Sequence, residues 1–197
     1  MAWDTAGTRR RLLDAGARQF AARGFAGTTM DALSRDAGVN KERVYAYFGD
    51  KRGLFGAVLA DRLGGLLDGA QVEGTGPAAV GAWAGELFDR YRRTPELARL
   101  LAWESLELDE AASADHRAAT CRDRATHLRA ALPGLDAARA QHLLLSVVTL
   151  VTGWWTLARL GDVVLTAGAG AGTGPDDAAD ARRAALVAHV EALAGAA

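Results

Sequence analysis

Apolar positions recur with helical spacing from the start of the chain. Between residues 8 and 23 they return every three or four positions, from Leu12 to Phe20, and so share one face of a predicted helix. Gly24 follows directly, and glycine adopts the left-handed conformation that commonly ends a helix without steric cost. The pattern therefore predicts an amphipathic first helix that stops just before Gly24.

The next two predicted helices are short and close together in the sequence. Thr28 stands three positions before Asp31, as in a capping pair, and Gly38 ends this second helix. Asn40 is a favourable N-cap for a third helix, and Glu42 places a negative charge in its first turn. Two short helices joined by a glycine-containing turn are typical of a helix-turn-helix.

The third helix divides its side chains between a core and an open face. At about 100° per residue, Val44 and Phe48 point toward the first two helices, with Tyr47 at the edge of that core. Tyr45 falls on the opposite side, together with Glu42. In a helix-turn-helix the second helix enters the major groove of DNA, so this open face is the predicted base-reading surface.

The rest of the chain also predicts helices. Val, Ile and Thr are sparse, whereas Ala, Arg, Gly and Leu dominate the composition, so local propensity favours helix over strand. We predict an all-α protein of about nine helices, the further ones lying at about residues 51–67, 77–92, 95–107, 110–132, 136–160 and 176–193.

Composition and charge narrow the class of protein. With 197 residues, 50% of them hydrophobic and 24% charged, the chain can bury a core and is too apolar to be disordered. Residues 1–60 hold ten Lys or Arg against six Asp or Glu, a net charge of +4, and the remainder holds 13 against 18, a net charge of −5. A basic first part suits a polyanionic partner, and a chance imbalance among solvated charges is the alternative.

Several short motifs follow one another in a fixed order between residues 8 and 63. After the Leu/Phe helix come Gly24-Phe25, Thr28-Thr29, Ala37-Gly38-Val39, Tyr45-Ala46-Tyr47-Phe48, Lys51 and Leu54-Phe55. At this spacing they resemble the TetR family of bacterial repressors. The resemblance implies a three-helix helix-turn-helix DNA-binding domain at residues 1–52 and a helical ligand-binding and dimerisation domain at residues 53–197.

The resemblance also implies which residues meet DNA. Thr29, Tyr47 and Lys51 match positions that grip phosphates in the family, so they should position the protein without reading bases. The first turns of the third helix supply the remaining predicted contacts, which are Asn40, Lys41, Glu42, Arg43, Tyr45 and Ala46. Family members often carry Ser at position 40, small residues at 42 and 43, and His at 46, so the operator sequence stays open.

Large aromatic side chains gather in the C-terminal part. They either pack in the core or line a cavity for a small molecule, and the candidates for such a ligand site are Trp83, Phe88, Trp103, Trp154 and Trp155. The predicted helix at 136–160 is apolar on two sides and needs a partner on each. In TetR-like proteins the last two long helices pair across a twofold axis, which predicts a dimer interface with Leu150, Trp154, Leu186 and Val190.

The sequence gives little support for a catalytic, metal or phosphate-binding site or for a membrane span. Cys121 lies five and six residues from His116 and His127, a spacing that does not place them together on a helix, and no metal or cofactor site is predicted. The glycine-rich stretch 168–175 lacks a phosphate-loop pattern and predicts a flexible connector. The apolar stretch 142–158 is shorter than the roughly 20 residues of a membrane span, which favours a buried helix.

These patterns together predict a function. We expect a homodimeric TetR-like repressor that binds a palindromic operator on double-stranded DNA and is released by a small-molecule effector. With one cysteine and no signal peptide, the expected location is the cytoplasm. The alternatives are a ligand-independent architectural DNA-binding protein and a small helical enzyme, the latter opposed by the lack of a matched acid, base and nucleophile.

Overall fold

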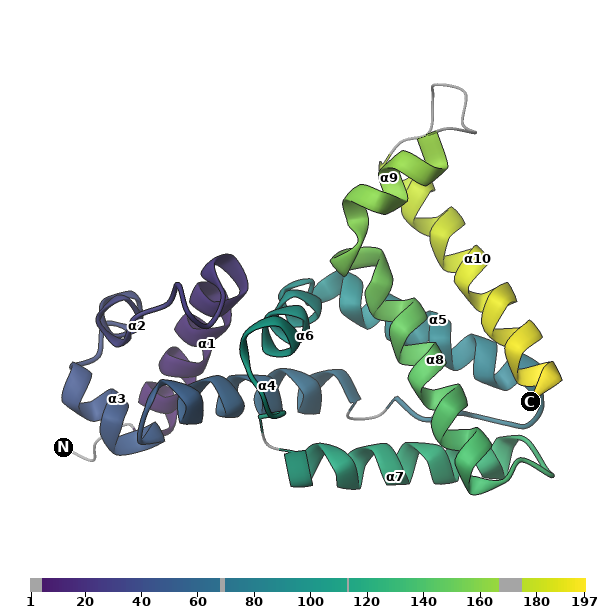
Figure 1. Cartoon of the computed structure of the whole chain (residues 1–197), viewed down its shortest axis with the longest axis horizontal. Coiled ribbons are helices and arrows are strands. Elements are labelled where there is room, and N and C mark those ends of the chain that lie inside the picture. Colours follow the sequence, from purple (N-terminus) through teal and green to yellow (C-terminus); the bar gives the residue numbers. More distant parts are fainter. Residues whose placement is uncertain (1–4, 68–69, 113, 167–174) are drawn as a thin grey trace. The chain divides into compact units, whose positions relative to one another are not determined.

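A computed structural model describes residues 5–67, 70–112, 114–166 and 175–197 (Figure 1). These residues form ten helices and no strand, which confirms the predicted all-α class. The helices are α1 (Thr5–Arg23), α2 (Met30–Ala37), α3 (Lys41–Phe48), α4 (Lys51–Leu67), α5 (Pro77–Arg93), α6 (Glu96–Glu107), α7 (Ala114–Ala131), α8 (Ala137–Thr156), α9 (Ala158–Thr166) and α10 (Pro175–Ala196).

The helices form two compact units, and each unit consists of two separate segments of the chain. The first unit contains Met1–Gly65 and Glu96–Arg117, and the second contains Leu66–Pro95 and Ala118–Ala197. Helix α6, which the sequence assigned to the C-terminal domain, therefore belongs with the N-terminal helices and packs on α1. The domain boundary predicted after residue 52 falls inside the first turn of α4.

An aromatic and aliphatic core holds the first unit together. Phe20 of α1 and Phe55 of α4 are fully buried and meet edge to face, with ring centroids 4.9 Å apart. Leu33 of α2 and Val44 of α3 are also fully buried. Each such side chain contributes about 1.5–3 kcal/mol by leaving water, so these contacts fix the two short helices that could not persist alone.

The ends of the short helices follow the local chemistry, with one change. Gly24 and Gly38 have φ values of 74° and 61°, the left-handed conformation expected where a helix ends. The N-cap of α2 is Thr29, whose hydroxyl accepts a hydrogen bond from the Ala32 amide at 3.2 Å. The expected capping residue, Thr28, is instead buried and donates its hydroxyl to the Gly24 carbonyl at 2.7 Å, so the cap lies one residue later.

In the second unit, α5 packs closely along α10. Gly81 and Gly85 of α5 make this possible, because a Cβ atom at either position would collide with α10 at Glu191 or Arg183. Helix α8 crosses α5 (Figure 1) and contacts both α5 and α10. Its buried face is formed by Ala140, Leu143, Leu144, Val147 and Val151.

Two predicted helices have different bounds in the structure. Helix α7 begins at Ala114 rather than at residue 110, because the buried Glu104 accepts a hydrogen bond from the Ala112 amide at 2.7 Å and holds the preceding turn. The helix predicted at 136–160 ends at Thr156. The hydroxyls of Thr152 and Thr156 donate to carbonyls one turn earlier, a bond that bends helices.

The apolar stretch after residue 142 thus forms two helices. Helices α8 and α9 meet at an angle of 83°. No single helix among the described residues is long and apolar enough to cross a membrane, and only this bent pair reaches that length and composition. Residues 168–174 of the predicted flexible connector lie outside the described residues.

Candidate nucleic-acid interface

Helix α3 separates an anchoring side from an exposed side, although Phe48, expected in the core beside Val44, is only half-buried. Val44 is fully buried, whereas Tyr45 retains 42% of its surface. Lys41, Glu42 and Ala46 are exposed as well. The side chains available to a partner therefore come mainly from the first two turns of the helix.

The N-terminus of α3 is ordered by two polar contacts. The Asn40 side-chain oxygen accepts from the Glu42 amide at 3.1 Å, which confirms Asn40 as the N-cap. Lys41 forms an ion pair of 2.8 Å with Asp31 of α2, and both side chains are exposed. The hydrogen bond from Lys41 keeps the pKa of the Asp31 carboxyl below its ordinary value, so the pair stays charged at neutral pH.

The predicted phosphate-gripping residues have different surroundings. Thr29 is exposed at the start of α2, where its hydroxyl already accepts from the helix. Tyr47 is half-buried, and its hydroxyl donates to the Thr5 carbonyl at 3.4 Å. Thr29 thus lies at the surface next to a helix N-terminus, a favourable place for an anion, whereas Tyr47 is partly engaged with α1.

Lys51 is engaged inside the first unit. Its ammonium group donates to the Phe25 carbonyl at 2.8 Å and to the Thr28 carbonyl at 3.1 Å. The same nitrogen lies 4.4 Å from the centre of the Phe25 ring, a cation–π contact. Lys51 therefore holds the turn between α1 and α2. The sequence did not reveal these contacts, because Phe25 lies 26 positions and Thr28 lies 23 positions before Lys51.

The same turn is held from α6. The Glu107 carboxylate accepts from the Ala26 amide at 2.9 Å, and the Trp103 indole N–H donates to the Ala21 carbonyl at 3.4 Å. At Gly24 a Cβ atom would lie only about 3 Å from both Glu107 and Trp103, so the glycine also permits the close approach of α6. The start of the helix-turn-helix is thus fixed by side chains from two other helices.

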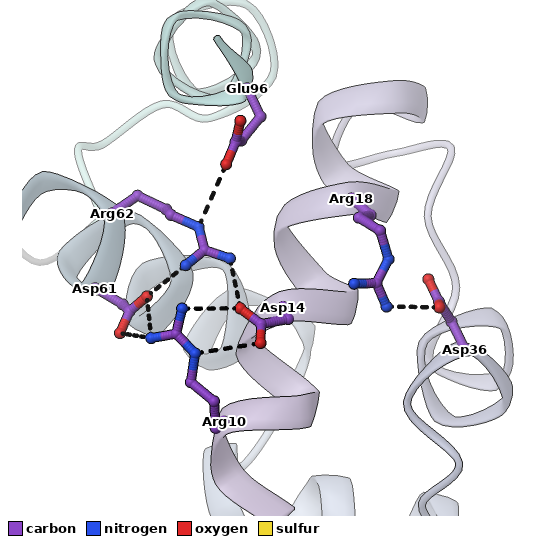
Figure 2. Close-up of polar contacts among 7 residues, drawn as sticks. All are labelled: Arg10, Asp14, Arg18, Asp36, Asp61, Arg62 and Glu96. Carbon is purple, nitrogen blue, oxygen red and sulfur yellow. Dashed lines mark hydrogen bonds and ion pairs between the residues drawn. The ribbon is translucent and has the colours of Figure 1, made fainter. Parts of the chain in front are cut away.

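An ion network connects α1, α4 and α6 in the first unit (Figure 2). Arg62 of α4 is at its centre and contacts Asp14 at 2.7 Å, Asp61 at 2.9 Å and Glu96 at 3.7 Å. Arg10 joins the same two aspartates. Burial opposes ionisation of Asp14, but hydrogen bonds from Arg62 and Arg10 outweigh it and lower the pKa of this carboxyl. The network positions α1, on which the helix-turn-helix packs.

Comparison with known proteins identifies this arrangement. Residues 12–58 match the family described as bacterial regulatory proteins, tetR family, and residues 79–191 match the tetracyclin repressor-like C-terminal domain. The crystal structure of the transcriptional regulator SCO4942 from Streptomyces coelicolor is 31% identical, with a TM-score of 0.74, over 94% of this chain and 97% of that one. The chain belongs to the TetR family. It is therefore a transcriptional regulator with a helix-turn-helix that binds DNA.

Two further known proteins are similar to this chain over different lengths. The transcriptional repressor SCO4008 of Streptomyces coelicolor is 36% identical over 104 residues, which is 53% of this chain and 53% of that repressor. The aligned part thus spans about half the length of this curated relative. FadR from Bacillus subtilis, solved in complex with stearoyl-CoA, shares the fold with a TM-score of 0.64 at 17% identity over 90% of this chain and 97% of that chain.

The structure brings together only some of the aromatic residues expected at a ligand site. Trp155 lies 4.8 Å from Phe88 and 5.6 Å from Tyr91, measured between ring centroids. Trp83 is buried in the same unit, where its indole N–H donates to the Ala70 carbonyl. Trp103 belongs to the first unit, against α1, and is therefore not part of that aromatic group.

The residues expected at a TetR-family dimer interface also separate into two groups. Leu186 and Val190 of α10 have 1% and 0% of their surface exposed within a single chain, so they are already covered. Leu150 is half-buried, and Trp154 lies under the Arg182 guanidinium at 5.6 Å. Helical periodicity revealed the apolar stripe of α10 but not that this stripe is already covered within the same chain, where α10 packs with α5 and α8.

Substituting Lys51 should affect folding of this TetR-family module more than its electrostatic attraction to DNA. We expect Lys51→Met to lower the free energy of unfolding by about 2 kcal/mol, because two charge-assisted hydrogen bonds are lost. The slope of DNA affinity against salt should fall by clearly less than one unit. Urea unfolding and salt titration of DNA binding measure the two effects, with Arg52→Met as the matched loss of charge in the same helical turn.

The two roles of Lys51 give opposite results in this comparison. A lysine that grips a phosphate would lower the salt slope by about one unit and leave stability unchanged. That outcome would assign Lys51 to the phosphate contact implied by the sequence. Arg52 is exposed, and its guanidinium lies 3.8 Å from the exposed Glu110 carboxylate and donates to the Glu110 carbonyl at 3.3 Å. Because these contacts are exposed to solvent, Arg52→Met should change stability little.

Proposed function

We propose that the protein is a homodimeric repressor that binds a palindromic operator through α3 and is released by a small-molecule effector. The observation that supports it most strongly is the exposed polar face of α3 in a chain of the TetR family. Lys41, Glu42 and Tyr45 on this face, with the half-buried Arg43 beside them, supply charged, hydrogen-bonding and aromatic groups within two turns, which suits the edges of bases in the major groove. Its place of action would be the cytoplasm, where such DNA lies.

The proposed dimer contact uses the outer face of α8. Leu145 and Val148 lie three positions apart on this face and remain 63% and 38% exposed, and Leu193 of α10 is 42% exposed. Large aliphatic side chains at adjoining exposed positions are typical of a surface that a partner covers. A twofold axis through such a contact would present one α3 helix to each half of a palindrome.

The proposed effector site lies in the second unit. Trp155 is half-buried above the buried rings of Phe88 and Tyr91, so it offers an aromatic surface next to the core. A ligand that binds more tightly to one arrangement of the dimer shifts the population toward it. Release follows if that arrangement spaces the two α3 helices away from the roughly 34 Å that separates successive major grooves.

Selection from a random DNA library tests this function. The purified protein should enrich a palindromic sequence, and sedimentation should show two protomers on each duplex. Tryptophan fluorescence against a panel of metabolites should then find a compound that also releases the selected DNA. Binding without sequence preference would instead favour an architectural protein, and turnover of a metabolite without DNA binding would favour an enzyme.

A further inference from the structure

Helix α3 contains a single acidic residue, Glu42, on the side that would face DNA. Its neighbour Lys41 is paired with Asp31 at 2.8 Å. The segment 30–48 holds three bases and three acids, so its net charge is zero, and the net charge of +4 carried by residues 1–60 lies outside this segment. Phosphates repel a carboxylate, and Glu42 should therefore weaken binding to DNA of most sequences.

Asn40 holds this carboxylate in place. Its side-chain oxygen accepts from the Glu42 amide at 3.1 Å, and its side-chain nitrogen donates to Oε2 of Glu42 at 3.3 Å. One amide side chain thus fixes both the backbone and the carboxylate of Glu42. A carboxylate has about four acceptor positions, so Oε1 keeps its capacity to accept a hydrogen bond from a partner.

The major groove offers two kinds of hydrogen-bond donor, the N4 amino group of cytosine and the N6 amino group of adenine. Adenine carries the acceptor N7 beside its amino group, and a carboxylate would be repelled there. Cytosine presents its amino group without an acceptor of its own on that edge, and it is the base that Glu or Asp contacts through N4. A held carboxylate at the start of a reading helix therefore favours cytosine.

We propose that Glu42 selects a cytosine in each half of the operator by accepting a hydrogen bond from its N4 amino group. This inference rests on the proposed function, because it requires α3 to enter the major groove. Repulsion from phosphates then lowers affinity for all DNA, and the cytosine contact restores it at the operator alone. Glu42 therefore contributes to discrimination between DNA sequences rather than to the total affinity for DNA.

The alternative is that Glu42 has only a structural role and stabilises α3. An acid in the first turn interacts favourably with the helix dipole without any contact to DNA. In that case its removal would change stability slightly and leave base preference untouched. The two roles therefore differ in the sequence selected rather than in the strength of binding.

The test compares DNA selected by the wild-type protein, Glu42→Gln and Glu42→Ala. The wild type should select cytosine at one symmetric position in each half-site. Glu42→Gln should move the preference at that position to adenine, because glutamine pairs with N6 and N7 of adenine. Glu42→Ala should lose the preference, so that discrimination against the other bases falls by about 5- to 150-fold.

Asp50→Asn is the matched control. It also removes one exposed acid from the DNA-binding unit, and asparagine can keep the hydrogen bond that Asp50 accepts from the Gly53 amide at 2.7 Å. Its selected sequence should equal that of the wild type. Unchanged base preference in both Glu42 variants, with a wild-type operator in hand, would overturn this inference alone. A wild-type protein that selects no sequence would overturn the proposed function as well.

Discussion

Replacing Val148 with aspartate should convert the protein to a monomer and lower operator affinity by about a hundredfold or more. Val148 and Leu145 lie on the outer face of α8, where we propose that a second copy binds. Burial of an unpaired carboxylate in an apolar contact costs several kcal/mol, enough to dissociate the dimer. Each monomer then binds one half-site without the gain from the linked second half.

Sedimentation velocity and operator titration measure both parts of this prediction. Leu106→Asp is a suitable control, because Leu106 of α6 is 76% exposed and lies in the first unit. That variant should remain a dimer. If Val148→Asp and Leu145→Asp both stay dimeric with full operator affinity, the contact does not use this face of α8.

Substitutions in α10 test folding rather than dimerisation. Leu186→Asp and Val190→Asp would place a carboxylate in the core of one protomer, where both side chains are buried and α10 packs with α5 and α8. These variants should unfold the second unit whether or not the protein is a dimer. The exposed residues of α8 therefore separate dimerisation from folding, and the buried residues of α10 do not.

Glu104→Leu should lower the free energy of unfolding by about 3 kcal/mol. Glu104 is only 6% exposed and accepts from both the Ala112 amide and the Arg117 guanidinium. Leucine removes the acceptor and leaves the partly buried Arg117 guanidinium without its carboxylate, with the Ala112 carbonyl still at 3.4 Å. We expect a loss of stability at the lower end of the range for buried ion pairs, because the Arg117 side chain is 26% exposed to solvent.

Denaturant unfolding followed by circular dichroism and by tryptophan fluorescence, to which Trp103 contributes close to the site, measures this change. The double variant Glu104→Leu/Arg117→Met should recover part of the lost stability, because an apolar pair of similar volume does not leave a charge unpaired. A decrease below about 1 kcal/mol for Glu104→Leu alone would contradict the structural role of this pair.

The features that the sequence predicts well are those set by neighbouring residues. Gly24 and Gly38 end helices, Asn40 begins α3, and Val44 is buried opposite Tyr45, all as local chemistry and helical periodicity require. The family itself is also recognisable from closely spaced motifs. These features depend on contacts within a few residues along the chain.

The features that the sequence did not predict depend on distant contacts. Glu107 holds the Ala26 amide across 81 positions, so nothing near either residue reveals the pair. Periodicity identifies an apolar stripe on α10 but cannot say whether α5 or a second protomer covers it. The assignment of α6 to the first unit, and with it the place of Trp103, is non-local in the same way.

The measurement that tests the central claim most directly is the affinity of Arg43→Ala and Tyr45→Ala for the selected operator and for unrelated DNA. Both residues lie on α3, and Tyr45 is 42% exposed. We predict that operator binding weakens by about 1–3 kcal/mol where a base contact is lost, and that binding to unrelated DNA changes much less. Unchanged operator affinity and unchanged base preference in both variants would contradict the assignment of α3 as the reading helix.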